Sequence, residues 1–248
     1  MTGPLTAAHA HADGGGDGDD AVTVVAGGLD GPRQVNDYKG DRLVVAESDS
    51  GEISSVDLDS GEVETLASGL VNPQGAAYRH GRLYIAVGEA GPPEEGAPPP
   101  ADPPAVGQGG PGLLVTDREG EVLHAVDLLQ YELDENPDGQ QQYDDAGAAV
   151  DALSNPFSVL VEHHRVLVAD AGANAVLSVD RRSGEVSTFF VPPVVTGDEV
   201  EACGTTANNN DDGFGCDPVP TGLAEGRHGH VYVSTLGAEV PGRRGCTS

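Results

Sequence analysis

The sequence predicts an all-β chain folded as a propeller of four-stranded antiparallel blades, and three observations support this prediction. A short phrase that contains proline recurs along the 248 residues, and each copy is followed by a short run of apolar residues. The two most similar copies place Pro32 and Pro73 41 residues apart. Propeller blades repeat at about 40–45 residues, and short β runs that repeat in this way form blades around a common axis.

Four copies of the proline phrase predict the first two strands of each blade. The phrases occupy residues 29–33, 70–74, 153–157 and 220–223. Each is followed by a run rich in Val, Leu, Ile or Tyr and bounded by turn residues, which is typical of a strand. These runs occupy residues 42–46, 82–86, 165–169 and 230–234. We expect the phrase to open the strand nearest the axis and the run to form the second strand.

The outer half of a blade is predicted by a third run that ends in Asp before a glycine turn. This pattern occurs at residues 53–57, 113–117 and 176–180. Residues 57–61 and 180–184 are predicted hairpin loops, because Asp and Ser side chains can bond the turning backbone and Gly accepts a positive φ. By the same alignment residues 21–26 match 62–67, so we expect the chain to begin with an outermost strand.

The predicted organisation is one interrupted propeller domain. Residues 1–20 are interpreted as a disordered acidic leader or the remnant of an export signal, since residues 13–20 are only Gly and Asp. Residues 21–242 form the partial propeller, and residues 243–248 are a tail outside the pattern. The blades are predicted at about 29–66, 70–125, 153–191 and 218–240, with insertions at 88–112, 123–150 and 192–216. The start of the second insertion, residues 124–132, permits a short helix.

The charge balance excludes some classes of partner. The chain has 41 acidic and 12 basic side chains, a formal charge of −29, and Lys39 is its one lysine. Such a surface repels phosphate backbones, so nucleic acid and anionic membranes are poor partners. Adaptation to high salt and the general solubility of an exported protein both explain the acidity. Membrane insertion is not expected, because no run approaches about 18 apolar residues.

Two features bear on the compartment. Residues 6–12 look like the small-residue end of an export signal, although the basic and apolar regions that should precede it are missing. Export is therefore expected, with a cytoplasmic location as the alternative. Cys203 and Cys216 bracket one loop and could form a disulfide in an oxidising compartment, which would leave Cys246 unpaired.

Several stretches resemble the ScyD/ScyE family of β-propellers. They are the NPDG at residues 136–139, LSNPF at 153–157, VLVADAGANAVLSVD at 166–180 and VYVSTLGAEVPG at 231–242. The resemblance covers roughly residues 21–242, and its most specific part is residues 170–174. It implies an exported, six-bladed propeller of the TolB-like type, related to NHL-repeat and SMP-30/gluconolactonase-like folds. It implies no reaction, and an analogy of fold alone does not supply one.

Because the family that the chain resembles has six blades, this chain is expected to form only an open arc. It contains three blades and half of another, which cannot close a ring of six. Residues 21–26 should then lack the partner strand that the last blade would provide. Both ends of the arc should expose strand edges and apolar faces. We therefore expect a C-terminal truncation, by a frameshift or an incomplete gene.

The resemblance favours a non-catalytic binding or scaffold protein whose partner is an unknown protein or small molecule. The alternative is a metal-dependent hydrolase of the lactonase or esterase type, like the SMP-30 relatives. Those hydrolases hold a divalent cation with Glu and Asn or Asp oxygens and typically place Asn after the blade proline. The corresponding residues here are Arg33, Gln74, Phe157 and Thr221, none of which is a carboxylate. No GxSxG elbow, HExxH motif or Cys/His zinc spacing occurs, so no catalytic residue is assigned.

A candidate ligand site is predicted at one mouth of the channel. Acidic residues end three of the second-strand regions, at Glu47, Glu89 and Asp170. They either cap the strand ends as turn residues or form a ring of oxygens that attracts a cation. Together with the residues that follow the prolines, the candidate ligand-binding set is Arg33, Gln74, Thr221, Glu47, Glu89 and Asp170.

A calcium site is the second candidate. Asp134, Asn136, Asp138 and Asp145 fit the spacing of a calcium loop, with Asp in place of Glu at the twelfth position. Oxygens at alternate positions around a glycine turn can converge on one hard cation. Pro137 is awkward inside such a loop, and the family's own NPDG turn explains the same residues without calcium.

Overall fold

The computed structural model describes residues 22–91, 104–140, 153–194 and 217–236, and within them the chain is almost entirely β. The remaining residues include Asp145, Cys203, Cys216 and Cys246, so the disulfide and the last calcium ligand lie outside the described residues. No helix in the described part is long and apolar enough to cross a membrane.

The strands form three four-stranded antiparallel sheets and one two-stranded sheet. The first blade contains β1 (Pro32–Asp37), β2 (Arg42–Glu47), β3 (Glu52–Asp57) and β4 (Val63–Ala67). The second contains β5 (Pro73–Arg79), β6 (Arg82–Val87), β7 (Gly112–Asp117) and β8 (Val122–Asp127). The third contains β9 (Pro156–Val161), β10 (Arg165–Asp170), β11 (Ala175–Asp180) and β12 (Val186–Phe190). The fourth contains β13 (Pro220–Glu225) and β14 (Val231–Thr235), joined through the short 3-10 turn η2 (Arg227–Gly229). Each blade proline opens the innermost strand, as predicted.

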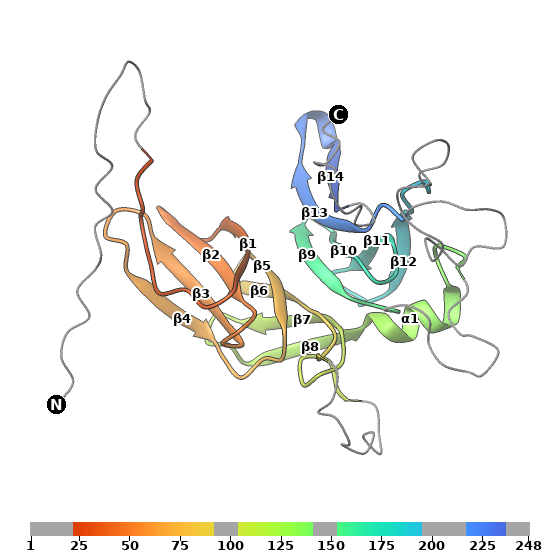
Figure 1. The fold of residues 1–248 in the computed structure, drawn as a ribbon, viewed down its shortest axis with the longest axis horizontal. Coiled ribbons are helices and arrows are strands. Elements are labelled where there is room, and N and C mark those ends of the chain that lie inside the picture. The colour runs from red at the N-terminus through yellow and green to blue at the C-terminus, as the bar shows by residue number, and fades with distance from the viewer. Residues whose placement is uncertain (1–21, 92–103, 141–152, 195–216, 237–248) are drawn as a thin grey trace, which may run out of the picture.

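The chain is an open β-propeller of about four blades. The innermost strands β1, β5, β9 and β13 follow one another around a common axis, each in contact with the next (Figure 1). The gap in the ring lies between the first and the fourth blade (Figure 1). Residues 22–26 belong to no strand, and β13 is the one described strand paired with β14. The expected open arc is therefore present.

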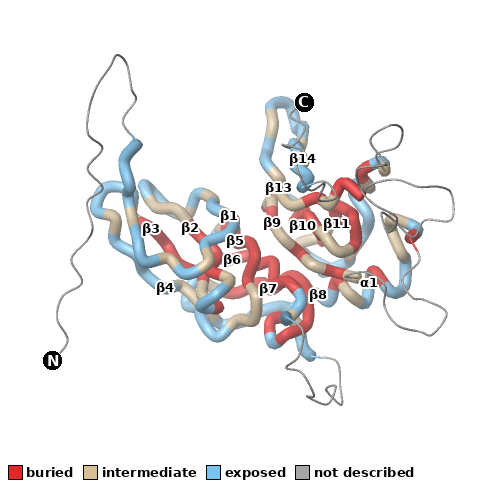
Figure 2. Tube along the Cα trace, in the orientation of Figure 1, coloured by how far each residue is buried: buried red, intermediate tan, exposed pale blue. Residues whose placement is uncertain are grey.

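The cores lie between neighbouring blades. One cluster, which includes Ile53 and Leu83, packs the first blade against the second. Another, which includes Tyr84, Leu113 and Leu177, packs the second against the third. Figure 2 shows buried residues along the middle strands of the complete blades, whereas β4, β8, β12 and β14 are largely exposed. The stacking of blade faces therefore supplies the apolar burial that stabilises the fold.

The predicted Asp hairpin loops form as expected. The Asp57 carboxylate accepts hydrogen bonds from the backbone N–H of Ser60 at 2.8 Å and of Asp59 at 3.1 Å, and Gly61 has a φ of 72°. Asp180 accepts the corresponding bonds from Ser183 N at 2.8 Å and Arg182 N at 2.9 Å. Because these donors favour the charged form, the pKa of each carboxyl lies below its usual value of 3.8.

The start of the second insertion differs from the prediction. Residues up to Asp127 belong to β8, the outermost strand of the second blade, and helix α1 (Leu128–Glu135) begins only after it. The Asp127 carboxylate accepts a hydrogen bond from Gln130 N at 2.9 Å and so caps the helix N-terminus. The helix prediction was therefore right in kind and misplaced by about one turn.

Polar side chains also tie the innermost strands together. The Gln34 amide on β1 bonds both the N–H and the C=O of Val159 on β9, each at 3.0 Å. Asn36 Nδ2 donates to Ala76 O on β5 at 2.8 Å. To reach β9 the Gln34 side chain passes against Gly75, where a Cβ would also lie 2.8 Å from the carbonyl oxygen of Phe157. The absence of a side chain at Gly75 is therefore what permits this crossing.

Candidate functional site

All blades close in the same way at one mouth of the channel. The residue after each second strand donates its backbone N–H to the carbonyl of the residue before the blade proline. The four bonds are Ser48 to Gly31 at 3.0 Å, Gly88 to Asn72 at 2.9 Å, Ala171 to Asn155 at 3.0 Å and Leu236 to Val219 at 3.0 Å. The predicted strand-end acids lie at this mouth.

Two of these acids are buried and hold the backbone. Glu47 pairs in register with Pro32 and Asp170 with Pro156, and they are 3 % and 0 % exposed. Glu47 Oε2 accepts from Asp30 N at 2.6 Å. Asp170 accepts from Ser154 Oγ at 2.7 Å and Asn155 N at 2.6 Å, and more weakly from the N–H groups of Gly172 and Ala173. Burial raises the pKa of Asp170, although these donors oppose the shift.

The third acid does not match the other two. In the second blade the residue paired with the proline is Val87, and Glu89 lies two residues beyond it and is exposed. Glu47, Glu89 and Asp170 therefore do not form one ring of oxygens. For Glu47 and Asp170 the structure agrees with the alternative prediction, in which they cap strand ends.

The residues after the prolines occupy equivalent positions but have different surroundings. Arg33 is exposed and donates from Nε to Ser48 Oγ at 3.0 Å. Gln74 is only 4 % exposed and donates from Nε2 to Asn72 Oδ1. Thr221 is half-buried on β13. These three side chains are therefore not joined in one hydrogen-bonded site.

Gln74 lies beside Asn155, a residue that the sequence analysis did not select. Gln74 Oε1 and Asn155 Oδ1 are buried and accept no hydrogen bond from the described residues. Both side chains surround Gly88, where a Cβ would lie 3.3 Å from Gln74 Cγ and clash with Asn155 Oδ1. Asn155 stands directly before its proline, and that position was the signal available in the sequence.

The described part of the calcium loop makes other contacts. Asp134 lies in α1 and accepts from Gln130 Nε2 at 3.0 Å. Asn136 ends the helix with a φ of 42° and donates from Nδ2 to Gln140 O at 2.7 Å, and Asp138 accepts from Gln140 N at 2.9 Å. Within the described residues no group of three or more His, Cys, Asp or Glu could hold a metal. With Asp145 outside those residues, the calcium site stays a prediction.

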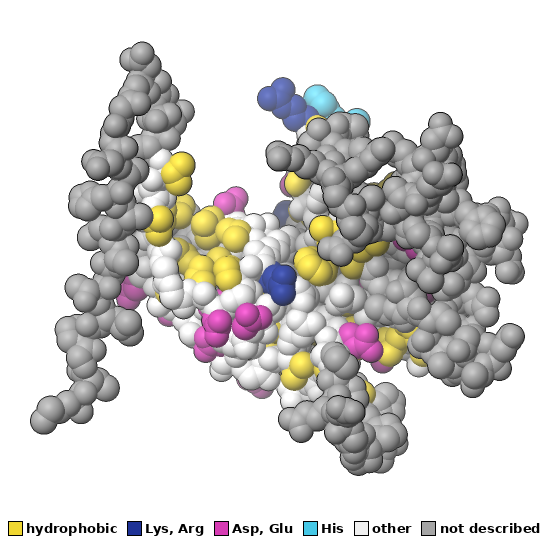
Figure 3. All heavy atoms as spheres, in the orientation of Figure 1, with side chains coloured by type: hydrophobic (Ala, Val, Ile, Leu, Met, Phe, Trp, Pro, Cys, Tyr) yellow, Lys and Arg dark blue, Asp and Glu magenta, His cyan; other side chains and the backbone are white. Residues whose placement is uncertain are grey.

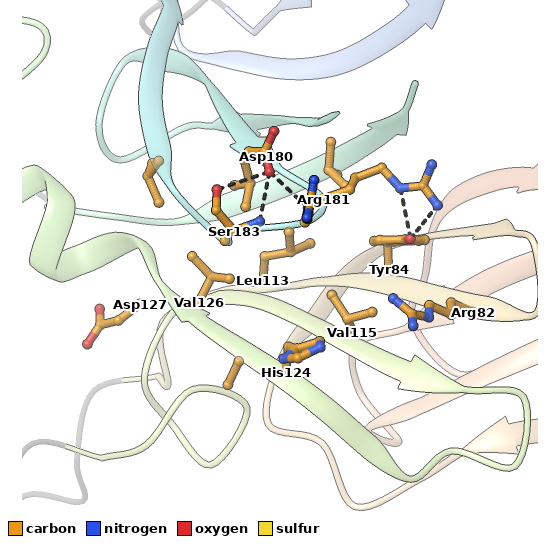
Figure 4. Close-up of a pocket in the computed structure, with 16 residues that line it drawn as sticks. Arg82, Tyr84, Leu113, Val115, His124, Val126, Asp127, Asp180, Arg181 and Ser183 are labelled. Carbon is orange, nitrogen blue, oxygen red and sulfur yellow. Dashed lines mark hydrogen bonds between the residues drawn. The ribbon is translucent and has the colours of Figure 1, made fainter. Parts of the chain in front are cut away.

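A pocket of about 400 Å³ lies between the second and third blades (Figure 4). Its arginines lie at the ends of β6 and β11 that are opposite to the channel mouth. The second blade contributes residues of β6, β7 and β8, and the third contributes β10, β11, β12 and the turn between the last two. Its apolar wall contains Leu113, Val115, Val126, Val166, Val179 and Val186. Its polar lining includes Arg82, His124, Arg181 and Arg182.

Arg181 joins the two blades at this pocket. Its Nε and Nη2 donate to the Tyr84 hydroxyl at 3.0 and 2.8 Å (Figure 4). Its Nη1 donates to the carbonyl oxygens of Glu162 and His163 at 3.2 and 2.8 Å. Tyr84 is 2 % exposed, so the guanidinium supplies the partner that a buried phenol requires.

The pocket is locally cationic. Arg82, Arg181 and Arg182 form no salt bridge with any acid in the described part of the chain. The lining also contains two acids, Asp180, which accepts from its own turn, and Asp127, which caps α1, so the arginines outnumber the carboxylates by one. This site is not apparent from the sequence, because its residues come from strands of two blades that are far apart along the chain. The available signal was Arg181–Arg182, one of two pairs of adjacent arginines in a chain with 12 basic residues.

Comparison with known proteins identifies no family. No family model matches the chain, and no curated protein matches it. The chain is similar to the computationally designed Ika8 protein (12 % identity, TM-score 0.40), covering 82 % of this chain and 43 % of that one. It is also similar to virginiamycin B lyase from Staphylococcus aureus (13 %, 0.37), covering 83 % and 64 %. A third similar structure is the extracellular domain of BT4673 from B. thetaiotaomicron (14 %, 0.40), covering 82 % and 22 %. The chain thus spans less than two thirds of each of these proteins, and the likeness concerns the fold alone.

Proposed function

We propose that this chain is an exported, ScyD/ScyE-like propeller that binds a protein or small molecule without transforming it. The family assignment rests on the motifs at residues 166–180 and 231–242, and export rests on residues 6–12. The open propeller fold is compatible with both. Binding through loops or pockets on a rigid β scaffold requires no reactive residue.

One observation carries the preference for binding over hydrolysis. The two buried carboxylates at the channel mouth, Glu47 and Asp170, each bond backbone N–H groups that open a blade. A carboxylate used in this way has its charge satisfied by fixed donors and is not presented to a metal or a substrate. Their role in the fold is thus sufficient to explain their burial.

Metal content and turnover test this proposal together. The purified full chain, equilibrated with calcium and zinc and then dialysed to remove unbound metal, should retain no stoichiometric amount of either. It should turn over no member of a panel of lactones and esters. Asp170→Asn should lower the melting temperature, because Asp170 holds the backbone before Pro156, and it should leave metal content and background turnover unchanged. Stoichiometric metal together with turnover would overturn the proposal.

A second candidate, the SMP-30-like metal-dependent hydrolase, is favoured by the two amide oxygens of Gln74 and Asn155. They are buried, close to one another around Gly88, and accept no hydrogen bond from the described residues. Amide oxygens are ligands that calcium accepts. The fit is partial, because Asp170, the carboxylate nearest in the hydrogen-bond network, is turned to the backbone of Asn155. Loss of bound metal in Gln74→Leu would support this candidate.

A further inference from the structure

We propose that the pocket between the second and third blades binds a small organic anion, in which one acidic head group is attached to an apolar body. This inference rests on the proposed binding function and gives it a ligand class. The candidate residues predicted from the sequence lie at the channel mouth, whereas this pocket lies away from that mouth.

The charge of the lining favours an anionic head group. Three of the 12 Lys and Arg side chains of a chain with a formal charge of −29 line this one pocket: Arg82, Arg181 and Arg182. Arg82 and Arg182 are exposed, so a bound anion gains charge-assisted hydrogen bonds from guanidinium groups that no carboxylate of the described residues occupies.

The three arginines have different parts in this arrangement. Arg181 is fixed by its bonds to Tyr84 and to the carbonyls of Glu162 and His163. Arg82 and Arg182 are exposed, and their guanidinium groups bond no residue in the described part of the chain, so their donors are available. A planar guanidinium presents paired N–H donors that match the two oxygens of a carboxylate.

The rest of the lining favours an apolar body. Ala125 is exposed and Val126 and Val186 are half-buried, so these side chains present apolar surface to the pocket. The buried side chains of Leu113, Val115, Val166 and Val179 lie behind them in the core. A volume of about 400 Å³ lies within the range of small-molecule sites, about 300–1,000 Å³. The pocket therefore has room for an aryl or alkyl group as well as for the head group.

Three matched probes test the charge preference. Isothermal titration of the full chain at constant ionic strength should show saturable binding of 4-phenylbutyrate. The neutral 4-phenylbutyramide, which has the same body, should bind about tenfold more weakly, because it lacks the charge-assisted hydrogen bonds. The cationic 4-phenylbutylamine should show no saturable binding. Equal binding of carboxylate and amine would overturn the proposal and indicate attraction to the acidic surface instead.

Two variants and a control place the binding in this pocket. Arg82→Gln and Arg182→Gln should each raise the dissociation constant of 4-phenylbutyrate about five- to tenfold, because each removes one charged donor. Arg118→Gln changes the net charge by the same amount but alters an exposed arginine outside the pocket lining that pairs with Glu119 at 2.7 Å. The dissociation constant of 4-phenylbutyrate for the Arg118→Gln variant should stay within twofold of the value for the parent chain.

Equal weakening in all three variants would overturn the pocket assignment, since it would show that only net charge matters. Absence of 4-phenylbutyrate binding to the parent chain, under conditions where a thermal melt shows that the chain is folded, would also overturn it. Neither outcome affects the proposed binding function, which fails only if the metal and lactone assays are positive.

Discussion

The residue before each blade proline has one of two backbone conformations. Gly31, Asn72 and Val219 have φ values of 64°, 51° and 52°, whereas the φ of Asn155 is not positive. Glycine adopts this left-handed region freely and asparagine tolerates it, but a β-branched residue there is strained. Three blades thus require the same conformation, and one of them meets it with a poorly suited residue.

Val219→Asn should therefore stabilise the chain by about 0.5–1 kcal/mol, as the left-handed conformation costs a β-branched residue about 1–2 kcal/mol and some side-chain packing is lost. The Val219 N–H that donates to Asn174 Oδ1 at 3.2 Å is kept. Urea unfolding measures the change. Val35→Asn, at an exposed valine within β1 that has no positive φ, is the matched control and should be neutral or destabilising. A loss of stability in Val219→Asn as large as in the control would contradict the argument.

The hairpin aspartates predict a specific acid response. The native pKa values of Asp57 and Asp180 lie below the usual 3.8, so these groups contribute stability above the unfolded pKa and lose it as the pH falls through the native pKa. The double variant Asp57→Asn/Asp180→Asn should be less stable than the parent chain at neutral pH, and the difference should shrink below about pH 4.

Thermal melts from pH 7 to pH 3 measure this difference between the two proteins, so the general effect of protonating the other acids cancels. Asp59→Asn is the matched control, in the same turn but with a carboxylate that accepts no hydrogen bond from the described residues, and it should leave the stability at pH 7 unchanged. A stability difference that persists unchanged to pH 3 would rule out the proposed role of the two carboxylates.

At the scale of elements, neighbouring blades are joined both by apolar contact and by single polar bridges. Arg181 on the turn after β11 and Tyr84 on β6 make one such bridge, and Asn36 on β1 with Ala76 on β5 makes another. Bridges of this kind set the register of one blade against the next, which apolar packing alone specifies less sharply.

Tyr84→Phe should destabilise the chain by about 1–3 kcal/mol, because it removes the acceptor of two guanidinium donors while keeping the ring in the core. Tyr232→Phe is the matched control, since Tyr232 is 65 % exposed and should tolerate the loss of its hydroxyl. Chemical denaturation of both variants measures the difference. If the two variants lose the same stability, the bridge contributes nothing.

Gly75→Ala should destabilise the chain by about 2 kcal/mol or more through overpacking. Its Cβ would lie 2.8 Å from Phe157 O and 3.0 Å from Ser158 Cα, both backbone atoms, and would also meet Gln34 Oε1. Gly27→Ala, where nothing lies within 4 Å, should be close to neutral. A double variant with Gln34→Ala should recover only part of the loss, since the backbone clash remains. Full recovery would show that the side chain alone causes the strain.

The sequence predicts these elements unevenly, for physical reasons. The prolines mark the starts of β1, β5, β9 and β13 because a fixed φ without an N–H suits a strand's first residue. The residues of β8 from 124 to 127 were included in the predicted helix, because the helix-forming residues of α1 follow them without a break. Asp170 could be selected from sequence, but its partners are backbone N–H groups that the sequence does not reveal. The pocket is lined by residues of two blades, and the sequence does not reveal which residues of separate blades face one another.

For the whole molecule, the open arc exposes surface that a closed ring would cover. Val22, Val24, Tyr232 and Leu236, near the two ends of the arc, are 97 %, 79 %, 65 % and 69 % exposed. Hydrophobic side chains also gather over the first blade in the view of Figure 3. A strand such as β14, paired on one side within the described residues, offers its free backbone groups to another chain. Repulsion between molecules with a formal charge of −29 opposes the association that this exposed surface favours.

The formal charge of −29 predicts how stability responds to salt. Self-repulsion among the acidic groups opposes the compact state, and it is screened as the Debye length falls from about 10 Å at 0.1 M to about 3 Å at 1 M. We expect the melting temperature at pH 7 to rise by several degrees as NaCl is raised to molar concentrations.

A pH control separates screening from other effects of salt. Near pH 4, where Asp and Glu are about half protonated, the net charge is small and the same addition of NaCl should change the melting temperature far less. A rise of equal size at both pH values would assign the effect to burial of apolar surface, which concentrated salts strengthen at any charge. A flat or falling melting temperature at pH 7 would instead mean that the acidic groups are spaced widely enough not to oppose folding, and it would remove adaptation to high salt as the explanation of the composition.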